Sequence, residues 1–194
     1  MLRADLAAIA AAVPFGASVL DVGCGDGALL AALRTEKATA GRGIELDGVN
    51  VAAAVARGLP VVQGDAGTDL ADYPSDAFDL AILSDTLQAM AAPDAVLGEL
   101  LRIARHALVS FPNFGHWRVR LSLLVHGRMP MTATLPVPWY ATPNIHLCSV
   151  DDFRALAAAR GFVIERATYL SSGRAIGPAL ANWRAEQAVF LLRR

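Results

Sequence analysis

Residues 19–27 read Val-Leu-Asp-Val-Gly-Cys-Gly-Asp-Gly, a short apolar run that ends in three glycines at alternate positions. The apolar run predicts a buried strand, and the helical period from Ala28 to Arg34 predicts a helix directly after the glycines. Glycine permits backbone conformations that are closed to other residues, and the helix N-terminus directs free N–H groups to the same place. The stretch therefore predicts a strand, a nucleotide-binding turn and a helix.

The glycine spacing by itself does not identify which nucleotide binds. Gly23, Gly25 and Ala28 satisfy the dinucleotide fingerprint in its G-x-G-x-x-G/A form, which is a weak signal. Glu45 ends the apolar run 43–45, about twenty residues after the glycines, where an acid accepts ribose hydroxyls. This position argues against a 2′-phosphate, but it does not separate NAD from S-adenosylmethionine.

Two aspartates favour S-adenosylmethionine. Asp21 lies directly before the turn, where its carboxylate suits the charged amino-acid end of that cofactor and would repel a pyrophosphate. Asp65 ends a second apolar run. Taken alone, Glu45 and Asp65 each also fit a helix N-cap or a solvated loop acid. Asp47 is interpreted as the cap of a helix from Val49 to Arg57.

The segments L-D-V-G-C-G-D-G, I-E and G-D-A follow one another in an order that resembles the class I S-adenosylmethionine-dependent methyltransferases. In that family the carboxylate after the third strand meets the adenine amino group, which implies this role for Asp65. The resemblance implies S-adenosylmethionine or S-adenosylhomocysteine as the cofactor. The predicted cofactor-binding residues are Asp21, Gly23, Cys24, Gly25, Gly27, Glu45, Leu46, Asp65, Ala66 and Ser84.

The middle of the chain alternates between expected strands and helices. Residues Phe78–Leu83 form a nearly continuous apolar run, which is typical of a buried parallel strand. Apolar residues at helical spacing predict a helix over Pro93–Arg105, and Ala107–Phe111 predicts the next strand. This alternation predicts a doubly wound α/β sheet within a single domain, residues 1–194.

The C-terminal part predicts a different arrangement. Ser149–Asp152 has the form of a capping box before a helix over Phe153–Arg160, and Gly161 ends that helix. Two consecutive strands, over Phe162–Leu170 and Ala188–Leu192, then favour an antiparallel hairpin at the sheet edge. The expected fold is a mostly parallel, seven-stranded, Rossmann-like sheet of the class I methyltransferase type with a C-terminal antiparallel hairpin.

Composition excludes several classes of protein. The formal net charge is -1 and no basic run exceeds two residues, which argues against binding to nucleic acid or to an anionic membrane. No apolar run reaches the roughly eighteen residues of a transmembrane helix, and residues 1–13 fit an opening amphipathic helix better than a signal peptide. Cys24 and Cys148 have neither metal nor disulfide spacing. We therefore expect a cytoplasmic protein without a bound metal.

Residues 111–150 differ in composition from the rest of the chain. They hold five of the 10 prolines, two of the 3 tryptophans and three of the 4 histidines. Because the segment follows the fifth expected strand, we interpret it as an insertion at the ligand-binding edge of the sheet. Its aromatic and basic residues suit a substrate carboxylate or a partner protein. They also suit the covering of an irregular backbone, so each histidine has a structural alternative.

The spacing of polar residues identifies no catalytic group. Asp85 follows the fourth expected strand and also fits the cap of the next helix. Residues 83–88 lack the Asn/Asp-Pro-Pro-aromatic motif with which amino-group methyltransferases hold a planar nitrogen. The candidates for a proton acceptor are His116, Tyr140, His146 and Asp85, and those for carboxylate binding are Arg118 and Arg120.

Four longer phrases point to a narrower family. They are I-L-S-D-T-L-Q-A from residue 82, F-P-N-F-G-H-W-R-V-R-L from residue 111, G-R-M-P from residue 127 and W-Y-A-T-P-N-I-H-L-C from residue 139. With the glycine turn, they resemble the methionine biosynthesis protein MetW family over about residues 17–170. The chain departs from the family at Asp85, where a glutamine is expected. The resemblance implies a cytoplasmic bacterial protein whose partner is a homoserine O-acyltransferase.

Two classes of function therefore remain open. In the first, the protein binds S-adenosylmethionine or its demethylated product and uses the insertion to support or regulate the acyltransferase. In the second, it is an active methyltransferase on a small molecule, and its catalysis depends mostly on positioning. A dehydrogenase that uses NAD is the third and least favoured class.

Overall fold

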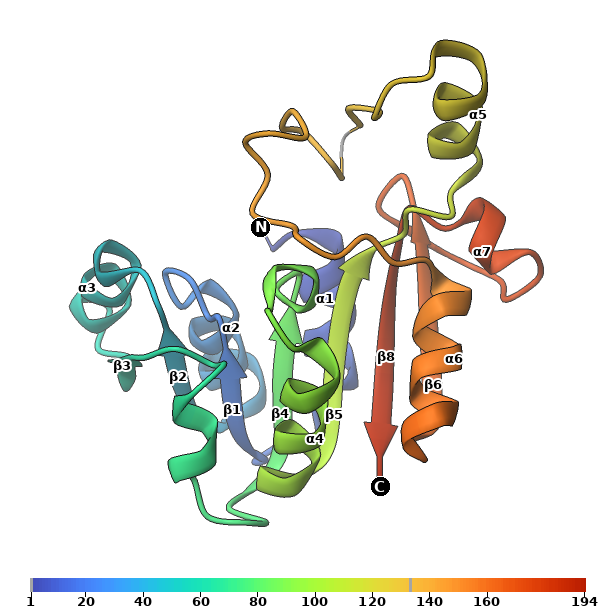
Figure 1. Ribbon diagram of the computed structural model, residues 1–194. Coiled ribbons are helices and arrows are strands. Elements are labelled where there is room, and N and C mark those ends of the chain that lie inside the picture. Colours follow the sequence, from blue (N-terminus) through green and yellow to red (C-terminus); the bar gives the residue numbers. More distant parts are fainter. Residues whose placement is uncertain (1, 133) are drawn as a thin grey trace.

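The computed structural model describes residues 2–132 and 134–194, whose strands form an eight-stranded sheet in the order β3-β2-β1-β4-β5-β8-β6-β7 (Figure 1). The strands are β1 (Ser18–Val22), β2 (Ala40–Glu45), β3 (Val61–Gln63), β4 (Phe78–Ser84), β5 (Ala104–Pro112), β6 (Val163–Ser171), β7 (Arg174–Ile176) and β8 (Gln187–Arg193). The helices are α1 (Ala4–Ala12), α2 (Ala28–Lys37), α3 (Gly48–Ala56), α4 (Pro93–Ile103), α5 (Trp117–His126), α6 (Val150–Arg160) and α7 (Ala181–Arg184), with 3₁₀ turns η1 (Asp69–Asp72) and η2 (Leu87–Ala89).

The first five strands are parallel, as the alternation of strands and helices predicts. β1 lies between β2 and β4, and β3 and β5 pair with the outer sides of β2 and β4. The chain therefore builds the sheet outward from β1, first on one side and then on the other. The crevice at the carboxyl ends of β1 and β4 is the point where open α/β sheets bind ligands.

Helices cover both faces of the sheet, so the doubly wound α/β prediction is confirmed. α1 and α2 pack on one face, where Ile9 and Leu33 join an apolar cluster with Ile82 of β4. α4 and α6 pack on the other face, where Phe153 joins a cluster with Leu83. Successive side chains of a strand point to opposite faces, and adjacent residues of β4 therefore belong to different halves of the core.

The antiparallel C-terminal part is confirmed, but the expectation of seven strands is wrong. β8 pairs antiparallel with both β5 and β6, and the additional strand β7 pairs antiparallel with β6. β6 and β7 are joined by Ser172 and Gly173, whose φ angles are 49° and 73°. Two consecutive residues with positive φ form the tight turn that favours hairpins. β7 is only three residues long, too short to show a period-two pattern.

The predicted helix caps are present. Asp47 Oδ1 accepts a hydrogen bond from Val49 N at 2.8 Å at the start of α3. Ser149 and Asp152 form a reciprocal capping box at the start of α6, and Gly161 ends that helix with a φ of 72°. Local side-chain chemistry therefore fixes these helix ends.

Residues 113–149, called the β5–α6 segment below, lie beyond the carboxyl ends of the parallel strands (Figure 1). The segment contains α5 and an isolated bridge between Thr132 and Leu135. The glycine turn after β1 lies at the same edge of the sheet (Figure 1). No helix in the described part of the chain combines the length and the apolar character needed to cross a bilayer.

Candidate functional site

The turn between β1 and α2 is built from three glycines with left-handed backbone. Gly23, Gly25 and Gly27 have φ angles of 71°, 56° and 77°, a region that other residues adopt only with strain. Gly23 N donates to Ile44 O at 2.8 Å, which ties the turn to β2. The turn therefore has a defined shape at the crevice beside β1.

The three glycines have different surroundings. A Cβ at Gly23 would lie 2.7 Å from Oγ1 of Thr86, and a Cβ at Gly27 would overlap the side chain of Leu59. These two positions are glycine because neighbouring side chains pack against the backbone. A Cβ at Gly25 would meet no atom within 4 Å, so the backbone there borders open space. Such a position lets a ligand approach the main chain closely.

Glu45, at the end of β2, supports the turn through two backbone groups. Its Oε2 accepts from Gly25 N at 2.8 Å, and its Oε1 accepts from Asp47 N at 3.0 Å. An ionised carboxylate offers about four acceptor positions. Glu45 therefore keeps acceptor capacity for the hydroxyl groups of a ligand while it holds the glycine turn.

Asp21 lies in β1 directly before the turn and is only 2% exposed. Burial, and to a smaller extent the nearby Glu45 carboxylate, raise the pKa of Asp21 to about 7. A cationic group bound at the turn would favour the ionised form of Asp21 and lower this pKa. The electrostatics of the site therefore fit a ligand with a sulfonium or ammonium group and disfavour a pyrophosphate.

The Cys24 side chain is buried beneath the turn. It belongs to an apolar cluster with Leu30 and Leu59, and its Sγ lies so close to Gly43 that a Cβ there would be only 2.6 Å away. Burial, followed by Asp21 and other carboxylates, raises the pKa of the thiol to about 12. The thiol therefore stays protonated and stabilises the turn by packing.

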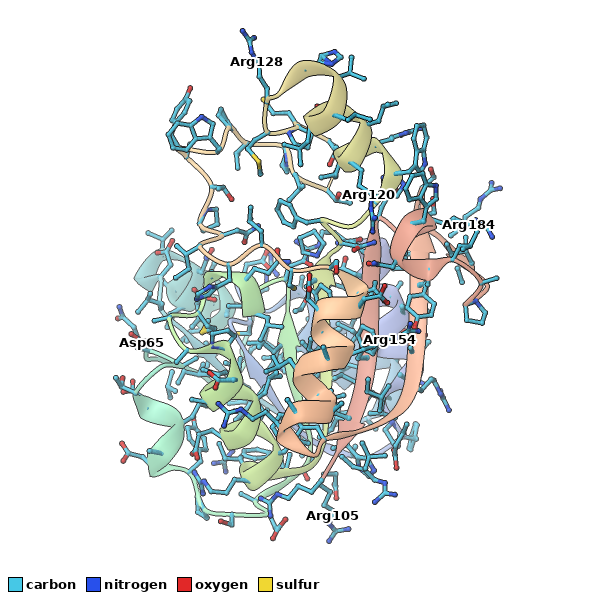
Figure 2. All side chains as sticks on the ribbon, turned by 45° about the vertical axis from the view of Figure 1, so that its right-hand side comes forward. Asp65, Arg105, Arg120, Arg128, Arg154 and Arg184 are labelled. Carbon is cyan, nitrogen blue, oxygen red and sulfur yellow. The ribbon has the colours of Figure 1, made fainter. Side chains whose placement is uncertain are left out.

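The predicted contacts after β2 and β3 lie on loops. Leu46 and Asp65 are exposed, and Ala66 is half-buried against the main apolar cluster. Asp65 Oδ1 accepts from Gly67 N at 2.7 Å within its own loop, and Figure 2 shows this side chain at the surface. Asp65 thus orders its loop and remains accessible to a ligand.

Ser84 belongs to a polar cluster that spacing in the sequence did not reveal. Ser84 Oγ donates to Asp5 Oδ2 at 3.2 Å, and Arg3 Nη2 pairs with Asp5 at 3.0 Å and with Asp85 at 3.2 Å. Asp5 lies in α1 and is 1% exposed. Ser84 and Asp5 are 79 residues apart in the chain, so no local pattern could indicate their contact.

Asp85 has a left-handed backbone, with a φ of 53°, and its side chain is held by Arg3 and Gln187. The helix-cap interpretation is wrong, because Thr86 is the N-cap residue of η2 and Asp85 bonds elsewhere. Burial and the Asp5 carboxylate raise the pKa of Asp85 to about 6, against the lowering effects of Arg3 and Gln187. This value lies in the range where a carboxylate accepts protons efficiently near neutral pH.

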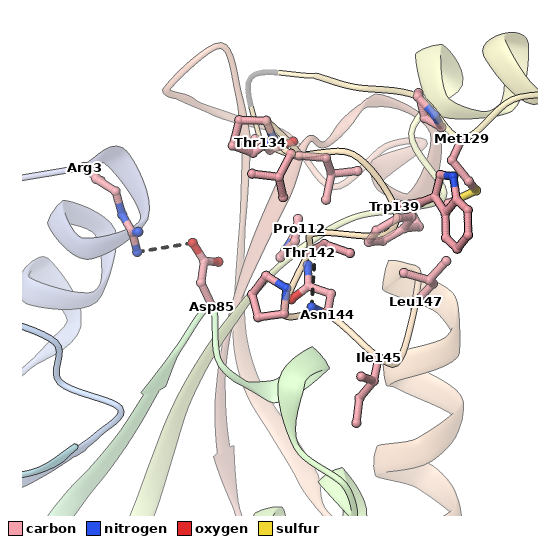
Figure 3. A pocket seen from close by; sticks show the side chains of 16 residues that line it. Arg3, Asp85, Pro112, Met129, Thr134, Trp139, Thr142, Asn144, Ile145 and Leu147 are labelled. Atoms are coloured by element: carbon pink, nitrogen blue, oxygen red, sulfur yellow. Dashed lines mark hydrogen bonds and ion pairs between the residues drawn. The ribbon is translucent and has the colours of Figure 1, made fainter. Parts of the chain in front are cut away.

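A cavity of about 540 Å³ opens beside Asp85 (Figure 3). Arg3 and Asp85 lie at one side of it, and the β5–α6 segment forms most of the remaining wall (Figure 3). Its volume is typical of pockets that bind small molecules. Apolar lining residues include Leu135, Val137, Trp139, Ile145 and Leu147. The cavity therefore suits a small molecule with an apolar body and one polar end.

The other candidates for proton transfer lie in separate places. His116 is buried, its Nδ1 accepts from Arg118 N at the start of α5, and burial lowers its pKa. Tyr140 and His146 are exposed in the irregular part of the β5–α6 segment. Among the described residues, no hydrogen bond or ion pair joins His116, Tyr140, His146 and Asp85. His116 caps α5, and the four candidates lie apart from one another, so each would have to act separately.

The fold and the glycine turn define a protein with the class I S-adenosylmethionine-dependent methyltransferase fold. An S-adenosylmethionine-dependent methyltransferase from Mesorhizobium loti superposes with a TM-score of 0.72 at 21% identity, covering 98% of this chain and 98% of that one. The [4+2]-cyclase SpnF superposes with a TM-score of 0.69 at 23% identity, covering 98% and 80%. At these identities the likeness concerns the fold alone, which hosts several chemistries.

Sequence comparison shows the family. The sequence model of the methionine biosynthesis protein MetW family matches residues 3–192. The chain is also 35% identical over 205 residues to the bifunctional methionine biosynthesis protein MetXA/MetW of Rhodopirellula baltica, covering 100% of this chain and 33% of the relative. The chain therefore belongs to the MetW family, as the four phrases predicted, and spans about a third of the length of this relative.

Proposed function

We propose that the protein binds S-adenosylmethionine or S-adenosylhomocysteine at the 23–27 turn and regulates a homoserine O-acyltransferase of methionine biosynthesis in the cytoplasm. The observation that carries the cofactor proposal is the combination of a buried Asp21, a turn held by Glu45 and an open backbone at Gly25. The partner proposal is supported by the Rhodopirellula baltica relative, whose name joins MetXA and MetW in one chain. Joining two proteins raises the effective concentration of each for the other, which is useful where they act together.

Three groups of the site would hold different parts of the cofactor. Glu45 would accept hydrogen bonds from the ribose hydroxyls. The carboxylate of Asp21, buried beside the turn, would stabilise the positive charges of the amino-acid end by electrostatic attraction. Asp65 would meet the adenine amino group, the role implied by the likeness to the methyltransferase family. When bound, S-adenosylmethionine would supply a methyl group on a sulfonium centre.

A short chain of contacts gives the cofactor site a route to the β5–α6 segment. Thr86 packs on Gly23 of the turn. Two residues further, Gln88 O accepts from Ile145 N at 2.8 Å and from His146 N at 2.9 Å. Gln88 Nε2 also donates to Cys148 O at 3.4 Å. A ligand that changes the position of the turn would therefore change the support of the β5–α6 segment, which is a physical basis for regulation.

Calorimetric titration with S-adenosylmethionine, S-adenosylhomocysteine and NAD tests the cofactor proposal. We expect binding of at least one of the two adenosyl sulfur compounds, no binding of NAD, and loss of binding in Gly25→Arg. Gly58→Arg is the matched control, because Gly58 also has positive φ (68°) and open space at its Cβ position but lies after α3. Binding of NAD alone, or unchanged binding by Gly25→Arg, contradicts the proposal.

Copurification with the homoserine O-acyltransferase of the same organism tests the partner proposal. We expect a complex, and we expect the acyltransferase activity to change when the protein is added and to change again with S-adenosylmethionine. The absence of both association and any effect on activity removes the partner proposal. The cofactor proposal is unaffected by that result, because calorimetry tests it separately.

The 540 Å³ cavity beside Asp85 favours a second candidate function, methyl transfer to a small molecule. Asp85 would accept the proton of an attacking nucleophile, and the cavity wall would position that nucleophile. Incubation with methyl-labelled S-adenosylmethionine and a small-molecule extract tests this function. Label transfer that is lost in Asp85→Asn supports methyl transfer, and the absence of labelled product from protein with bound cofactor contradicts it.

A further inference from the structure

Helix α5 carries an apolar stripe that faces solvent. Of its 10 residues, which the structure describes in full, only Val119 is buried. Trp117, Leu121, Leu124 and Val125 follow the spacing of one helix face and are 38%, 48%, 84% and 64% exposed. These four residues are called the α5 stripe below. At 100° per residue they lie opposite Val119, so α5 turns its one buried residue toward the protein and presents the stripe outward.

Two arginines border the α5 stripe. Helical geometry places Arg118 on one side of the stripe and Arg120 on the other. The Arg118 guanidinium lies 5.3 Å from the Trp117 ring centroid and 3.8 Å from the carboxylate of Glu186. Arg120 lies 5.3 Å from the ring centroid of Trp183, which is exposed on α7. Arg120 Nε also donates to Gly115 O at 2.6 Å. The stripe is therefore an apolar surface with one arginine on each side, and each arginine is held in place by neighbouring groups.

The β5–α6 segment has no acidic residue of its own, and the Glu186 carboxylate near Arg118 comes from the chain before β8. The sequence contains no aspartate or glutamate from residue 100 to residue 150, whereas the β5–α6 segment contains three arginines and three histidines. Arg120 and Arg128 lie near opposite ends of α5 (Figure 2). A complementary partner must therefore combine an apolar groove with acidic side chains at its borders.

We infer that the α5 stripe, with Arg118 and Arg120, is the surface through which the protein docks on its acyltransferase, in an apolar groove bordered by aspartates and glutamates. This inference rests on the proposed function, which names that partner. An exposed tryptophan and arginines are the residue types that most often dominate binding energy. A helix that lays an apolar face into a groove is also a recurrent mode of recognition.

The charge of the whole chain favours a protein partner over an anionic membrane surface. The net charge is -1, so the basic region around α5 is balanced by acidic residues elsewhere. Interfacial membrane helices combine a large apolar face with many basic residues, whereas α5 has four stripe residues and two bordering arginines. An acidic protein groove matches both the size and the charge of this surface.

The variant Leu124→Glu tests the docking inference, because Leu124 is the most exposed residue of the stripe. We expect its affinity for the acyltransferase to fall at least tenfold in calorimetric titration, with S-adenosylmethionine binding unchanged. Val55→Glu is the matched control, since Val55 is 52% exposed on α3, away from α5. We expect Arg118→Glu to slow association most at low salt, where charge attraction is least screened.

The outcomes separate this inference from the proposed function. If the wild-type protein does not bind the acyltransferase, the partner proposal fails. If the wild type binds and Leu124→Glu binds equally tightly, only the docking surface is wrong. If the protein sediments with phosphatidylserine vesicles and Leu124→Glu does not, the stripe binds a membrane and the inference is overturned. If analytical ultracentrifugation shows a dimer that Leu124→Glu dissociates, the stripe binds a second copy of the chain, which also overturns the inference.

Discussion

At the scale of single residues, the protonation of Asp21 makes stability depend on pH. Its pKa is raised to about 7 in the folded protein, against 3.8 ordinarily. The folded state therefore holds a proton that the unfolded state releases, and this stabilisation is complete below pH 4 and lost as pH rises through 7. Between pH 5 and pH 8 the wild type should lose stability on the order of 3 kcal/mol, and Asp21→Asn should not. The Tm of Asp21→Asn relative to that of the wild type should therefore be higher at pH 8 than at pH 5 by roughly 6–12 °C.

Thermal unfolding of both proteins at the two pH values measures this effect. Asp65→Asn is the control, because Asp65 is an exposed carboxyl group at the same edge of the sheet. A Tm difference between Asp21→Asn and wild type that is the same at pH 5 and pH 8 contradicts the prediction. Asp21→Asn should also lose affinity for S-adenosylmethionine, so that greater stability at pH 8 accompanies weaker binding.

Residue roles could be predicted from the sequence where their partners are near in the chain. Asp47 caps α3 through an amide two residues away, and the Ser149 capping box spans three residues. Arg3 and Asp5 gave no such signal, because Asp5 meets Ser84 only when α1 packs on the sheet. The sequence also could not show that Cys24 points into the core, since the glycine pattern defines the backbone of the turn and not its side chains.

At the scale of elements, η2 joins the core to the β5–α6 segment through Gln88. Its buried Nε2 donates to Pro112 O at 3.0 Å and to Cys148 O at 3.4 Å. Gln88→Ala leaves these carbonyls without that donor, and we expect a loss of about 1–3 kcal/mol of stability. The amides of residues 145–148 should exchange with solvent at least tenfold faster, because the end of the segment is held less firmly.

Hydrogen exchange followed by mass spectrometry measures this prediction. Gln63→Ala is a matched control, since the Gln63 side chain also donates to a backbone carbonyl, Leu46 O, at 3.2 Å. Gln63 is exposed and lies in β3, the edge strand that is remote from the β5–α6 segment. Equal exchange of residues 145–148 in Gln88→Ala and wild type would show that other contacts hold the segment. A general increase in exchange over all elements would indicate global destabilisation instead.

The sequence predicts the positions of the long helices and strands, but it does not predict the short strand β7. The long apolar runs of β4 and β5 and the periodic pattern of α4 have the expected positions, with bounds that differ by a few residues. The sequence does not predict β7, because Arg174-Ala175-Ile176 has no recognisable pattern and the position of this strand depends on pairing with β6. The dipeptide Ser172-Gly173 is a turn signal that favours such a hairpin, and it was the available clue.

At the scale of the whole molecule, the cofactor site, the cavity and the α5 stripe have different origins in the sequence. The glycine turn is local and could be predicted from nine consecutive residues. The cavity is formed by residues from Arg3 to Leu147 and exists only when α1, β4 and the β5–α6 segment meet. The α5 stripe follows a helical period, but its exposure depends on what packs against α5, which sequence does not reveal.

If both binding proposals hold, thermodynamic linkage requires the two sites to influence each other equally. A ligand that steadies the turn and η2 lowers the cost of ordering the β5–α6 segment on docking, so we expect S-adenosylmethionine to tighten acyltransferase binding roughly fivefold or more. The acyltransferase must then tighten S-adenosylmethionine binding by the same factor. Calorimetry around all four sides of this cycle measures both factors. Thr86→Ala, which loosens the contact with Gly23, should reduce them together, whereas Thr35→Ala, at an exposed threonine near the end of α2, should not. If both ligands bind and neither changes the affinity of the other, the two sites are independent and the protein does not transmit cofactor binding to its partner.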